Sequence, residues 1–213
     1  ALRDELSRDY PNGRFLALAF DVRSREAVED AIASLPPEWQ TIGTLINNAG
    51  LAVGLEPLHE GNPDDWERMI DTNIKGLLYV TRAVAPGMAK RRAGHIVNLG
   101  SIAGREVYPG GAVYCATKHA VRALSQGMRQ DLLPYGIRVS LICPGAVETE
   151  FSLVRFKGDN QRAASVYDGY TPLTADDIAR TIRFALNAPA HVDLQDILVM
   201  PTAQADSRTF HRG

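Results

Sequence analysis

Short apolar runs alternate with stretches of helical periodicity along the whole chain. The runs are poor in charge, as expected of strands that are covered on both faces, and they predict five strands. The runs are FLALAF at 15–20, TLI at 44–46, HIVNL at 95–99, RVSLIC at 138–143 and ILVM at 197–200. Strands that alternate with helices are typical of an α/β fold with a mostly parallel sheet. At 213 residues, the length predicts a single domain over 1–213.

Helices are predicted between these runs. Ser24 is a suitable N-cap for a helix over 24–35, and two prolines end that helix. The other predicted helices cover 62–92, which is long enough to bend, 111–133, and 174–187, where Thr174 and Asp177 have nearly the spacing of a capping box. Residues 146–173 show no clear period, and we expect a lid or a binding segment there.

Composition excludes several classes of function. The 23 basic residues nearly balance the 25 acidic ones, and a net charge of −2 attracts neither nucleic acid nor an anionic membrane surface. The cysteines and histidines lack metal-ligand spacing, so we expect no metal site, and we expect Cys115 to be a small core residue. Because there is no disulfide framework and no apolar run long enough to span a membrane, the cytoplasm is the expected compartment.

The chain has 18 glycines, but none forms the Gly-rich turn that receives a pyrophosphate in a dinucleotide-binding sheet. Residues 1–9 have the pattern of the end of a helix that leads into the 15–20 strand. We therefore expect the opening β-α-β unit to be absent from this sequence and the domain to be N-terminally incomplete. The 15–20 strand would then have no partner on one side.

Tyr114 and Lys118 are four residues apart near the start of the 111–133 helix and therefore share one of its faces. A cation close to a phenol favours the phenolate and lowers the pKa of the tyrosine below its ordinary value of about 10. This arrangement would make Tyr114 a general acid or base. The alternative is a solvated helix face without a catalytic role.

Small and polar residues follow three of the predicted strands. Ser101 comes after the 95–99 strand, NNAG at 47–50 ends the strand before it, and Pro-Gly at 144–145 ends the strand after it. The carboxyl ends of parallel strands meet at one edge, where open α/β sheets bind their ligands. Each segment alone could be an ordinary turn. Three of them at one edge, beside a Tyr/Lys helix, indicate a site.

These motifs together resemble the short-chain dehydrogenase/reductase family, and the resemblance covers the chain from Phe15 onward. It rests on Asp21-Val22, Asn47-Asn48-Ala49-Gly50, Asn73 in DTNIKG, Asn98-Leu99-Gly100-Ser101, Tyr114 to Lys118, and Pro144-Gly145 with Thr149. The stretches DDWERMIDTNIKGLLYVTRAVAPGM, EFSLVRFKGD and HVDLQDILVMPTAQA are similar to a branch of the family that oxidises small 3-hydroxy acids with NADP. The resemblance implies a Rossmann-type, doubly wound sheet.

The resemblance also implies a division of roles. A hydride passes between the nicotinamide and the substrate carbon, and Tyr114 moves the hydroxyl proton. Ser101 positions and polarises the substrate oxygen, and Asn73 keeps a water for proton exchange. Lys118 lowers the pKa of Tyr114 and holds the nicotinamide ribose. The cofactor, NADP rather than NAD, would lie against Asp21, Val22, Asn48, Ala49, Gly50, Tyr114, Lys118, Pro144, Gly145, Ala146, Val147 and Thr149.

A hydroxy acid has a carboxylate, which calls for a cation, preferably the fork of an arginine. Arg155 is therefore expected to contact the substrate together with Ser101 and Tyr114, and Lys157 and Arg105 are further candidates. The alternative for each cation is a charge that points into water. The expected substrates are serine, L-allo-threonine or 3-hydroxypropionate. Two other functions stay open: a 3-oxoacyl carrier-protein reductase of the same family, and a non-catalytic scaffold, which would not need the serine, tyrosine and lysine.

Apolar residues at helical spacing on the two long helices suggest assembly. They are Leu77, Val80 and Val84 on one helix and Val121, Leu124 and Met128 on the other. If the sheet leaves them uncovered, they would pair across a two-fold axis, and the resemblance implies a homotetramer. The alternative is that these side chains belong to the core.

Overall fold

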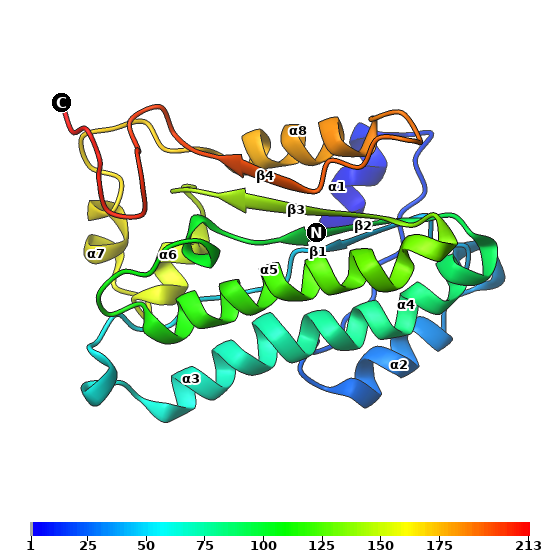
Figure 1. The fold of residues 1–213 in the computed structure, drawn as a ribbon, viewed down its shortest axis with the longest axis horizontal. Coiled ribbons are helices and arrows are strands. Elements are labelled where there is room, and N and C mark those ends of the chain that lie inside the picture. Colours follow the sequence, from blue (N-terminus) through cyan, green and yellow to red (C-terminus); the bar gives the residue numbers. More distant parts are fainter. Residues whose placement is uncertain (1) are drawn as a thin grey trace.

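The computed structural model describes residues 2–213. Its centre is a sheet with the strand order β1-β2-β3-β4, in which every neighbouring pair is parallel (Figure 1). The strands are β1 Thr44–Asn47, β2 His95–Leu99, β3 Arg138–Pro144 and β4 Asp196–Val199. The last four predicted strands are therefore confirmed, and so is the α/β fold with a parallel sheet.

Helices cover both faces of this sheet, as in a Rossmann-type, doubly wound fold. The α-helices are α1 Leu2–Asp9, α2 Arg25–Ala33, α3 Pro63–Ile70, α4 Leu77–Arg91, α5 Ala112–Leu132, α6 Glu150–Arg155, α7 Asn160–Ser165 and α8 Ala175–Leu186. In Figure 1, α4 and α5 lie on one face of the sheet and α8 lies on the other. The strands point toward the end of the molecule where α6 and α7 lie.

The central strands bury side chains on both faces of the sheet. In β2, Ile96 packs in a cluster with Met88 of α4 and Val121 of α5. Its neighbour Val97 packs instead against Ile178 of α8. Because successive side chains of a strand point to opposite faces, a strand between two layers of helices needs apolar residues in both phases. This explains the nearly continuous apolar runs in the sequence.

The apolar residues at helical spacing on the two long helices are mostly core. Leu77, Val84, Val121 and Met128 are buried in the cluster between the sheet and the helices. Leu124 packs against this cluster, and Val80 is half-buried. The condition for pairing across a two-fold axis is therefore not met by most of these side chains, and the alternative, that they belong to the core, holds for them.

The helix boundaries follow the predicted capping residues. Ser24 accepts a hydrogen bond from the N–H of Ala27 at the start of α2. At α8, Thr174 and Asp177 form a capping box in which each side chain bonds the backbone of the other. Both local predictions are confirmed. Capping residues mark the start of a helix because they satisfy backbone N–H groups that have no partner within the helix.

The predicted 62–92 helix is interrupted by a π-helical turn over Asp71–Gly76, between α3 and α4. A π turn accommodates one extra residue and is frequent at functional sites. Here it contains Asn73, whose buried side chain leaves the helix to bond another segment. The long predicted helix therefore forms, with this turn as its irregular part.

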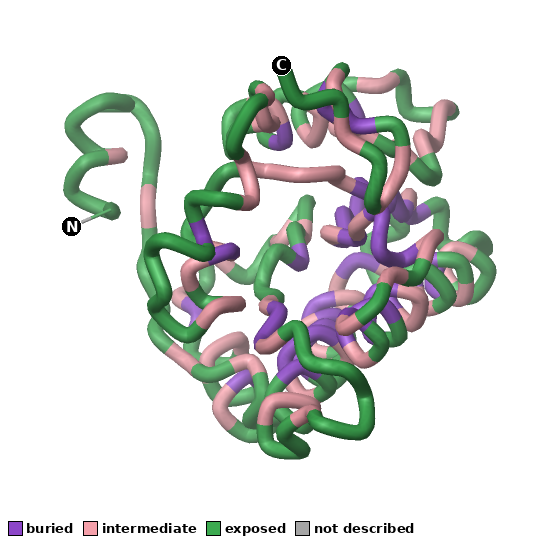
Figure 2. The backbone as a smooth tube through the Cα atoms, turned by 90° about the vertical axis from the view of Figure 1, so that its left-hand side faces the viewer, coloured by how far each residue is buried: buried purple, intermediate pink, exposed green. Residues whose placement is uncertain are grey.

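Residues 15–20 are not a strand, which corrects one prediction. A strand exists only by hydrogen bonding to a neighbour, and no described segment pairs with these residues. Leu16 and Leu18 are 41% and 40% exposed. Figure 2 shows that the N-terminal segment stands beside the rest of the chain, and α1 has no buried residue.

The segment 146–173 holds α6 and α7, short helices that its lack of a clear period did not predict. Tyr167 connects parts of this segment, since its hydroxyl bonds the Val147 carbonyl at 2.8 Å and the Ser152 hydroxyl at 2.7 Å.

Among the described residues, no helix combines the length and the apolar character that a membrane span needs.

Candidate active site

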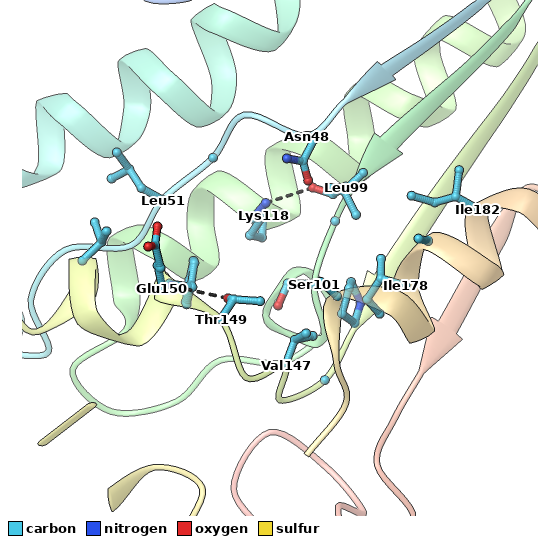
Figure 3. Close-up of a pocket in the computed structure, with 18 of the residues that line it drawn as sticks. Asn48, Leu51, Leu99, Ser101, Lys118, Val147, Thr149, Glu150, Ile178 and Ile182 are labelled. Carbon is cyan, nitrogen blue, oxygen red and sulfur yellow. Dashed lines mark hydrogen bonds between the residues drawn. The ribbon is translucent and has the colours of Figure 1, made fainter. Parts of the chain in front are cut away.

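A cavity of about 690 Å³ lies at the carboxyl end of the sheet (Figure 3). Its floor comes from the ends of three strands, one wall from the start of α5, and the other from α6 and α8. It is lined by Ile46, Asn48, Gly50, Leu51, Leu99, Gly100, Ser101, Tyr114, Lys118, Pro144, Gly145, Val147, Thr149, Glu150, Phe151, Val154, Ala175, Ile178, Ala179 and Ile182. The structure thus brings the strand-end motifs and the Tyr/Lys pair together, as predicted.

Ser101 lies directly beyond β2. The N–H of Gly100 bonds the carbonyl of Ile142 at 2.7 Å, which extends the β2–β3 pairing to the residue before Ser101. The Ser101 hydroxyl accepts a hydrogen bond from the N–H of Ala103 at 3.1 Å and caps a 3₁₀ turn over Ile102–Gly104. The serine is therefore held by a strand on one side and a tight turn on the other.

Tyr114 and Lys118 are both buried on the cavity side of α5, each 7% exposed. The Lys118 ammonium donates a hydrogen bond to the Leu99 carbonyl at 2.9 Å (Figure 3). Its Nζ atom lies 6.0 Å from the centre of the Tyr114 ring. The shared helix face is confirmed, but the ammonium is anchored to the end of β2 and not to the phenol.

The electrostatics of this pair differ from the prediction. Burial raises the pKa of Tyr114 above its ordinary value, and the charge of Tyr108 acts in the same direction. A hydrogen bond with Ser101 and the Arg155 guanidinium act the other way. The lowered pKa that was expected from Lys118 is therefore not present in this structure, because loss of solvent outweighs the attraction of a distant ammonium.

Lys118 is perturbed by the same burial. Removing its ammonium from water lowers its pKa from 10.5 to about 8. The only acceptor that the described residues give its three N–H donors is the Leu99 carbonyl. The cavity therefore contains a desolvated cation that can donate further hydrogen bonds.

Asn73 lies behind this wall, where its amide bonds the loop after β1. Its Oδ1 accepts from the N–H of Leu51 at 2.8 Å, and its Nδ2 donates to the Leu51 carbonyl at 2.8 Å and to Thr117 at 3.0 Å. The side chain therefore positions the backbone beside Gly50. Its Oδ1 accepts only the bond from the Leu51 N–H within the described chain and has a second lone pair, so the predicted role of holding a water stays a prediction.

The loop after β1 comes close to the Tyr/Lys helix at Gly50. A β-carbon at this position would lie 3.3 Å from Asn73 Oδ1 and 3.5 Å from Lys118 Nζ. Asn48 and Gly50 line the cavity, whereas Ala49 does not. The glycine lets the backbone pass next to the ammonium.

The loop after β3 forms the opposite edge of the cavity. Gly145 bonds the Val199 carbonyl at 2.7 Å, and the N–H of Ala146 donates to the Gln204 side chain at 2.8 Å. Thr149 caps α6 by accepting from the N–H of Phe151 at 3.3 Å. Of the residues predicted for this loop, all but Ala146 line the cavity.

Asp21 and Val22 lie outside the cavity. An ion pair with Arg23, 2.6 Å long, lowers the pKa of the Asp21 carboxyl to about 2. Val22 packs against Gly76, where an added β-carbon would lie 2.8 Å from its Cγ2 atom. Neither residue lines the cavity, and their predicted place beside the adenine stays a prediction.

The three candidate cations for a carboxylate differ in their surroundings. Lys157 pairs with Asp65 at 2.7 Å, and Arg105 pairs with Asp196. Neither is therefore the free substrate cation that the sequence allowed. Arg155 faces Tyr108 instead.

Arg155 lies between two tyrosine rings at the edge of the site. Its Nη2 donates to the Tyr108 hydroxyl at 2.9 Å, and its guanidinium carbon is 5.8 Å from the centre of the Tyr114 ring. Its Nε is buried and has no hydrogen-bond partner in the described chain. Arg155 does not line the cavity itself, but Phe151 and Val154 of the same helix do.

Sequence reasoning missed several lining residues. Glu150 and Phe151 come from α6, and Ile178 and Ile182 come from α8. The sequence did contain a signal for the α8 residues, because these two isoleucines are four residues apart on an amphipathic helix.

Within the described residues, no group of three or more His, Cys, Asp or Glu side chains could hold a metal ion.

A model of the short chain dehydrogenase family matches residues 1–159. The chain therefore belongs to the short-chain dehydrogenase family, as its motifs indicated.

Individual relatives have narrower descriptions. The chain is 50% identical over 206 residues to the NADP-dependent 3-hydroxy acid dehydrogenase YdfG of Salmonella typhi, an alignment that covers 96% of this chain and 81% of that relative. It is 45% identical over 197 residues to the NADP-dependent 3-hydroxy acid dehydrogenase of Schizosaccharomyces pombe, covering 92% of this chain and 76% of the relative.

Solved structures agree with these relatives. The closed form of a serine dehydrogenase complexed with NADP+ superposes with a TM-score of 0.91 at 47% identity, over 99% of this chain and 85% of that one. The serine dehydrogenase of Escherichia coli gives a TM-score of 0.79 at 42% identity, over 95% and 84% of the two chains.

Proposed function

We propose that this protein is an NADP-dependent oxidoreductase of small 3-hydroxy acids, of the serine, L-allo-threonine or 3-hydroxypropionate type. The observation that carries the proposal is the convergence of Ser101, Tyr114 and Lys118 on one cavity. The similarity to 3-hydroxy acid and serine dehydrogenases supports this substrate class over acyl carrier-protein substrates. A non-catalytic scaffold would not require the three side chains in one place.

The residues around the cavity suit a nicotinamide cofactor. Gly50 and Gly145 both line the cavity, and the lack of a side chain there lets their backbone lie against Asn73 and Gln204. The Lys118 ammonium has donors left for the ribose hydroxyls. Asn48 to Gly50 would lie along the cofactor, Pro144 to Thr149 would hold its nicotinamide end, and Asp21 with Val22 would lie near its adenine. Bound there, NADP would supply the acceptor for the hydride that leaves the substrate carbon.

The protein's own groups then handle the proton and the substrate oxygen. The Ser101 hydroxyl donates to that oxygen and holds it next to Tyr114. The Tyr114 phenolate takes the hydroxyl proton during oxidation, and the phenol returns it during reduction. Lys118, whose Nζ lies 6.0 Å from the centre of the Tyr114 ring, supplies a positive charge to the same cavity, and Asn73 keeps the loop at Leu51 in register with the helix.

Arg155 is our candidate for the substrate carboxylate. Its unpartnered Nε–H is a buried donor, and a buried donor without an acceptor is costly. The guanidinium lies over the ring of Tyr114, so a carboxylate bonded to it would place a 3-hydroxyl near the phenol. Phe151 and Val154 of the same helix line the cavity, but Arg155 does not. The Arg155 side chain would therefore have to rotate toward the cavity to bind the carboxylate.

The expected assembly is a homotetramer in the cytoplasm. The two buried cysteines suit a reducing compartment. Leu78 and Ile70, both 38% exposed, are apolar residues on the outer side of the α3–α4 region that a partner could cover. Light scattering of the purified protein would show four chains per particle, and a monomer would contradict the proposal.

A substrate panel tests the function. Formation of reduced nicotinamide is followed by absorbance with NADP or NAD and with L-serine, L-allo-threonine or 3-hydroxypropionate. The proposal predicts turnover of free hydroxy acids with NADP preferred. Activity confined to acylated carrier protein would favour the reductase alternative, and no turnover with any of these would favour the scaffold.

A further inference from the structure

Two arginines from different elements, Arg105 after the Ser101 turn and Arg122 on α5, converge on the carboxylate of Asp196, the first residue of β4. Arg105 donates to its Oδ1. The Nε of Arg122 lies 3.6 Å from its Oδ2. In sequence, Arg105 is four residues after Ser101, and Arg122 is four residues after Lys118. One carboxylate therefore links the serine turn to the helix of the catalytic tyrosine and lysine.

The link from Asp196 to Ser101 runs through a closed backbone turn. The turn from Ser101 to Arg105 is closed by the N–H of Gly104 bonding the Ser101 carbonyl at 2.9 Å and by the N–H of Arg105 bonding the Ile102 carbonyl at 2.9 Å. The same turn rests on α5, because a β-carbon on Gly104 would lie 2.7 Å from the Lys118 carbonyl oxygen. A shift of Arg105 would therefore be passed on to Ser101.

The link is also better shielded than an ordinary surface pair. The side chains of Asp196 and Arg105 are 29% and 28% exposed, and that of Arg122 is 49% exposed. The Cys143 sulfur lies 3.6 Å from the same Oδ1 that accepts from Arg105. Partial burial reduces screening by solvent and salt, so this pair can fix a geometry.

We propose that Asp196 is a positioning residue that holds the Ser101 turn against the Tyr114/Lys118 helix and so sets the distance between the serine hydroxyl and the phenol. This inference rests on the proposed roles of Ser101 and Tyr114. Arg105 pairs with Asp196 and is therefore not free to bind the substrate carboxylate. Its proposed role is to hold the Ser101 turn.

The link predicts a measurable effect on acidity. The Ser101 hydrogen bond lowers the pKa of Tyr114 against the effect of burial. The other titratable groups that face the phenol are Tyr108, Cys115, Arg155 and Lys118, and Asp196 bonds none of them. A loosened serine turn should therefore raise the Tyr114 pKa without changing its other neighbours.

The test compares Asp196→Asn with Asp176→Asn, a matched control that breaks an exposed ion pair with Arg180 on α8. With NADP and 3-hydroxypropionate, we expect Asp196→Asn to lower kcat about tenfold, because small displacements of reacting groups are expensive. The alkaline rise of kcat should move to higher pH, while the KM for the hydroxy acid changes little. NADP affinity, measured by tryptophan fluorescence, should match wild type and the control.

Further variants separate positioning from mere stability. Asp196→Glu, which restores the charge, should recover part of kcat, and Arg105→Gln should reproduce the shift of the pH profile even if Asp196→Asn fails to fold. A lowered melting temperature with kcat and pH profile unchanged in Arg105→Gln would overturn the inference. Loss of the proposed function itself would appear differently, as wild-type protein that does not oxidise hydroxy acids at all.

Discussion

Replacing Lys118 by methionine should stabilise the protein at neutral pH when no cofactor is added. Burial lowers the pKa of Lys118 from 10.5 to about 8, and each pH unit corresponds to about 1.4 kcal/mol, so keeping the ammonium charged in the folded state costs about 3 kcal/mol. Methionine keeps a similar length without the charge. It loses the hydrogen bond to the Leu99 carbonyl, which contributes about 1 kcal/mol. The net expectation is a gain of about 2 kcal/mol at pH 7.

The sign of the pH dependence follows from proton binding. Below pH 8 the lysine is protonated in the folded and unfolded states, and the full penalty applies to wild type. Between pH 8 and 10.5 the unfolded state still binds the proton that the folded state has released, so wild-type stability rises with pH. The advantage of Lys118→Met should therefore shrink across this window and reverse near its upper end.

Urea unfolding of wild type and Lys118→Met at pH 7, 8, 9 and 10, in the absence of NADP, measures this difference directly. The variant should have the higher free energy of unfolding at pH 7, and the gap should close by about 1.4 kcal/mol per pH unit above pH 8. A gap that stays constant with pH, or a variant that is less stable at pH 7, would refute the assignment of a desolvated, charged lysine.

Three further predictions follow from the same geometry. Gly50→Ala should weaken NADP binding about tenfold in a fluorescence titration, with little loss of melting temperature, because its β-carbon enters the space beside Lys118. Arg155→Gln should raise the KM for 3-hydroxypropionate at least about tenfold and leave turnover of the neutral 1,3-propanediol unchanged, since only the acid needs the guanidinium; equal losses on both would exclude a carboxylate contact. Binding of NADP at pH 8.5 should take up protons in calorimetry with two buffers, because new acceptors raise the Lys118 pKa, and Lys118→Met should abolish the uptake.

Local chemistry made much of this structure predictable. Ser24 and the Thr174/Asp177 pair marked helix starts because capping depends on residues next to each other in the chain. Tyr114 and Lys118 were placed on one face by helical spacing alone. The three strand-end motifs met at one edge because parallel strands share their direction.

What failed depended on neighbours distant in sequence. The 15–20 run had the composition of a strand, but pairing requires an adjacent strand that the described chain does not supply. The π turn holds Asn73, whose side chain bonds Leu51, 22 residues away, and helical spacing does not report such a contact. The pKa of Tyr114 was misjudged because spacing reports a cation four residues along but not the burial of the phenol.

The central claim is that Tyr114 moves the substrate proton in a cavity that it shares with Ser101 and Lys118. The most direct test is single-turnover oxidation of 3-hydroxypropionate by Tyr114→Phe with saturating NADP, alongside the dissociation constant of NADP and the melting temperature. The account predicts that hydride transfer is lost while cofactor binding and melting stay close to wild type. Hydride transfer at the wild-type rate in a folded, NADP-bound Tyr114→Phe would contradict it.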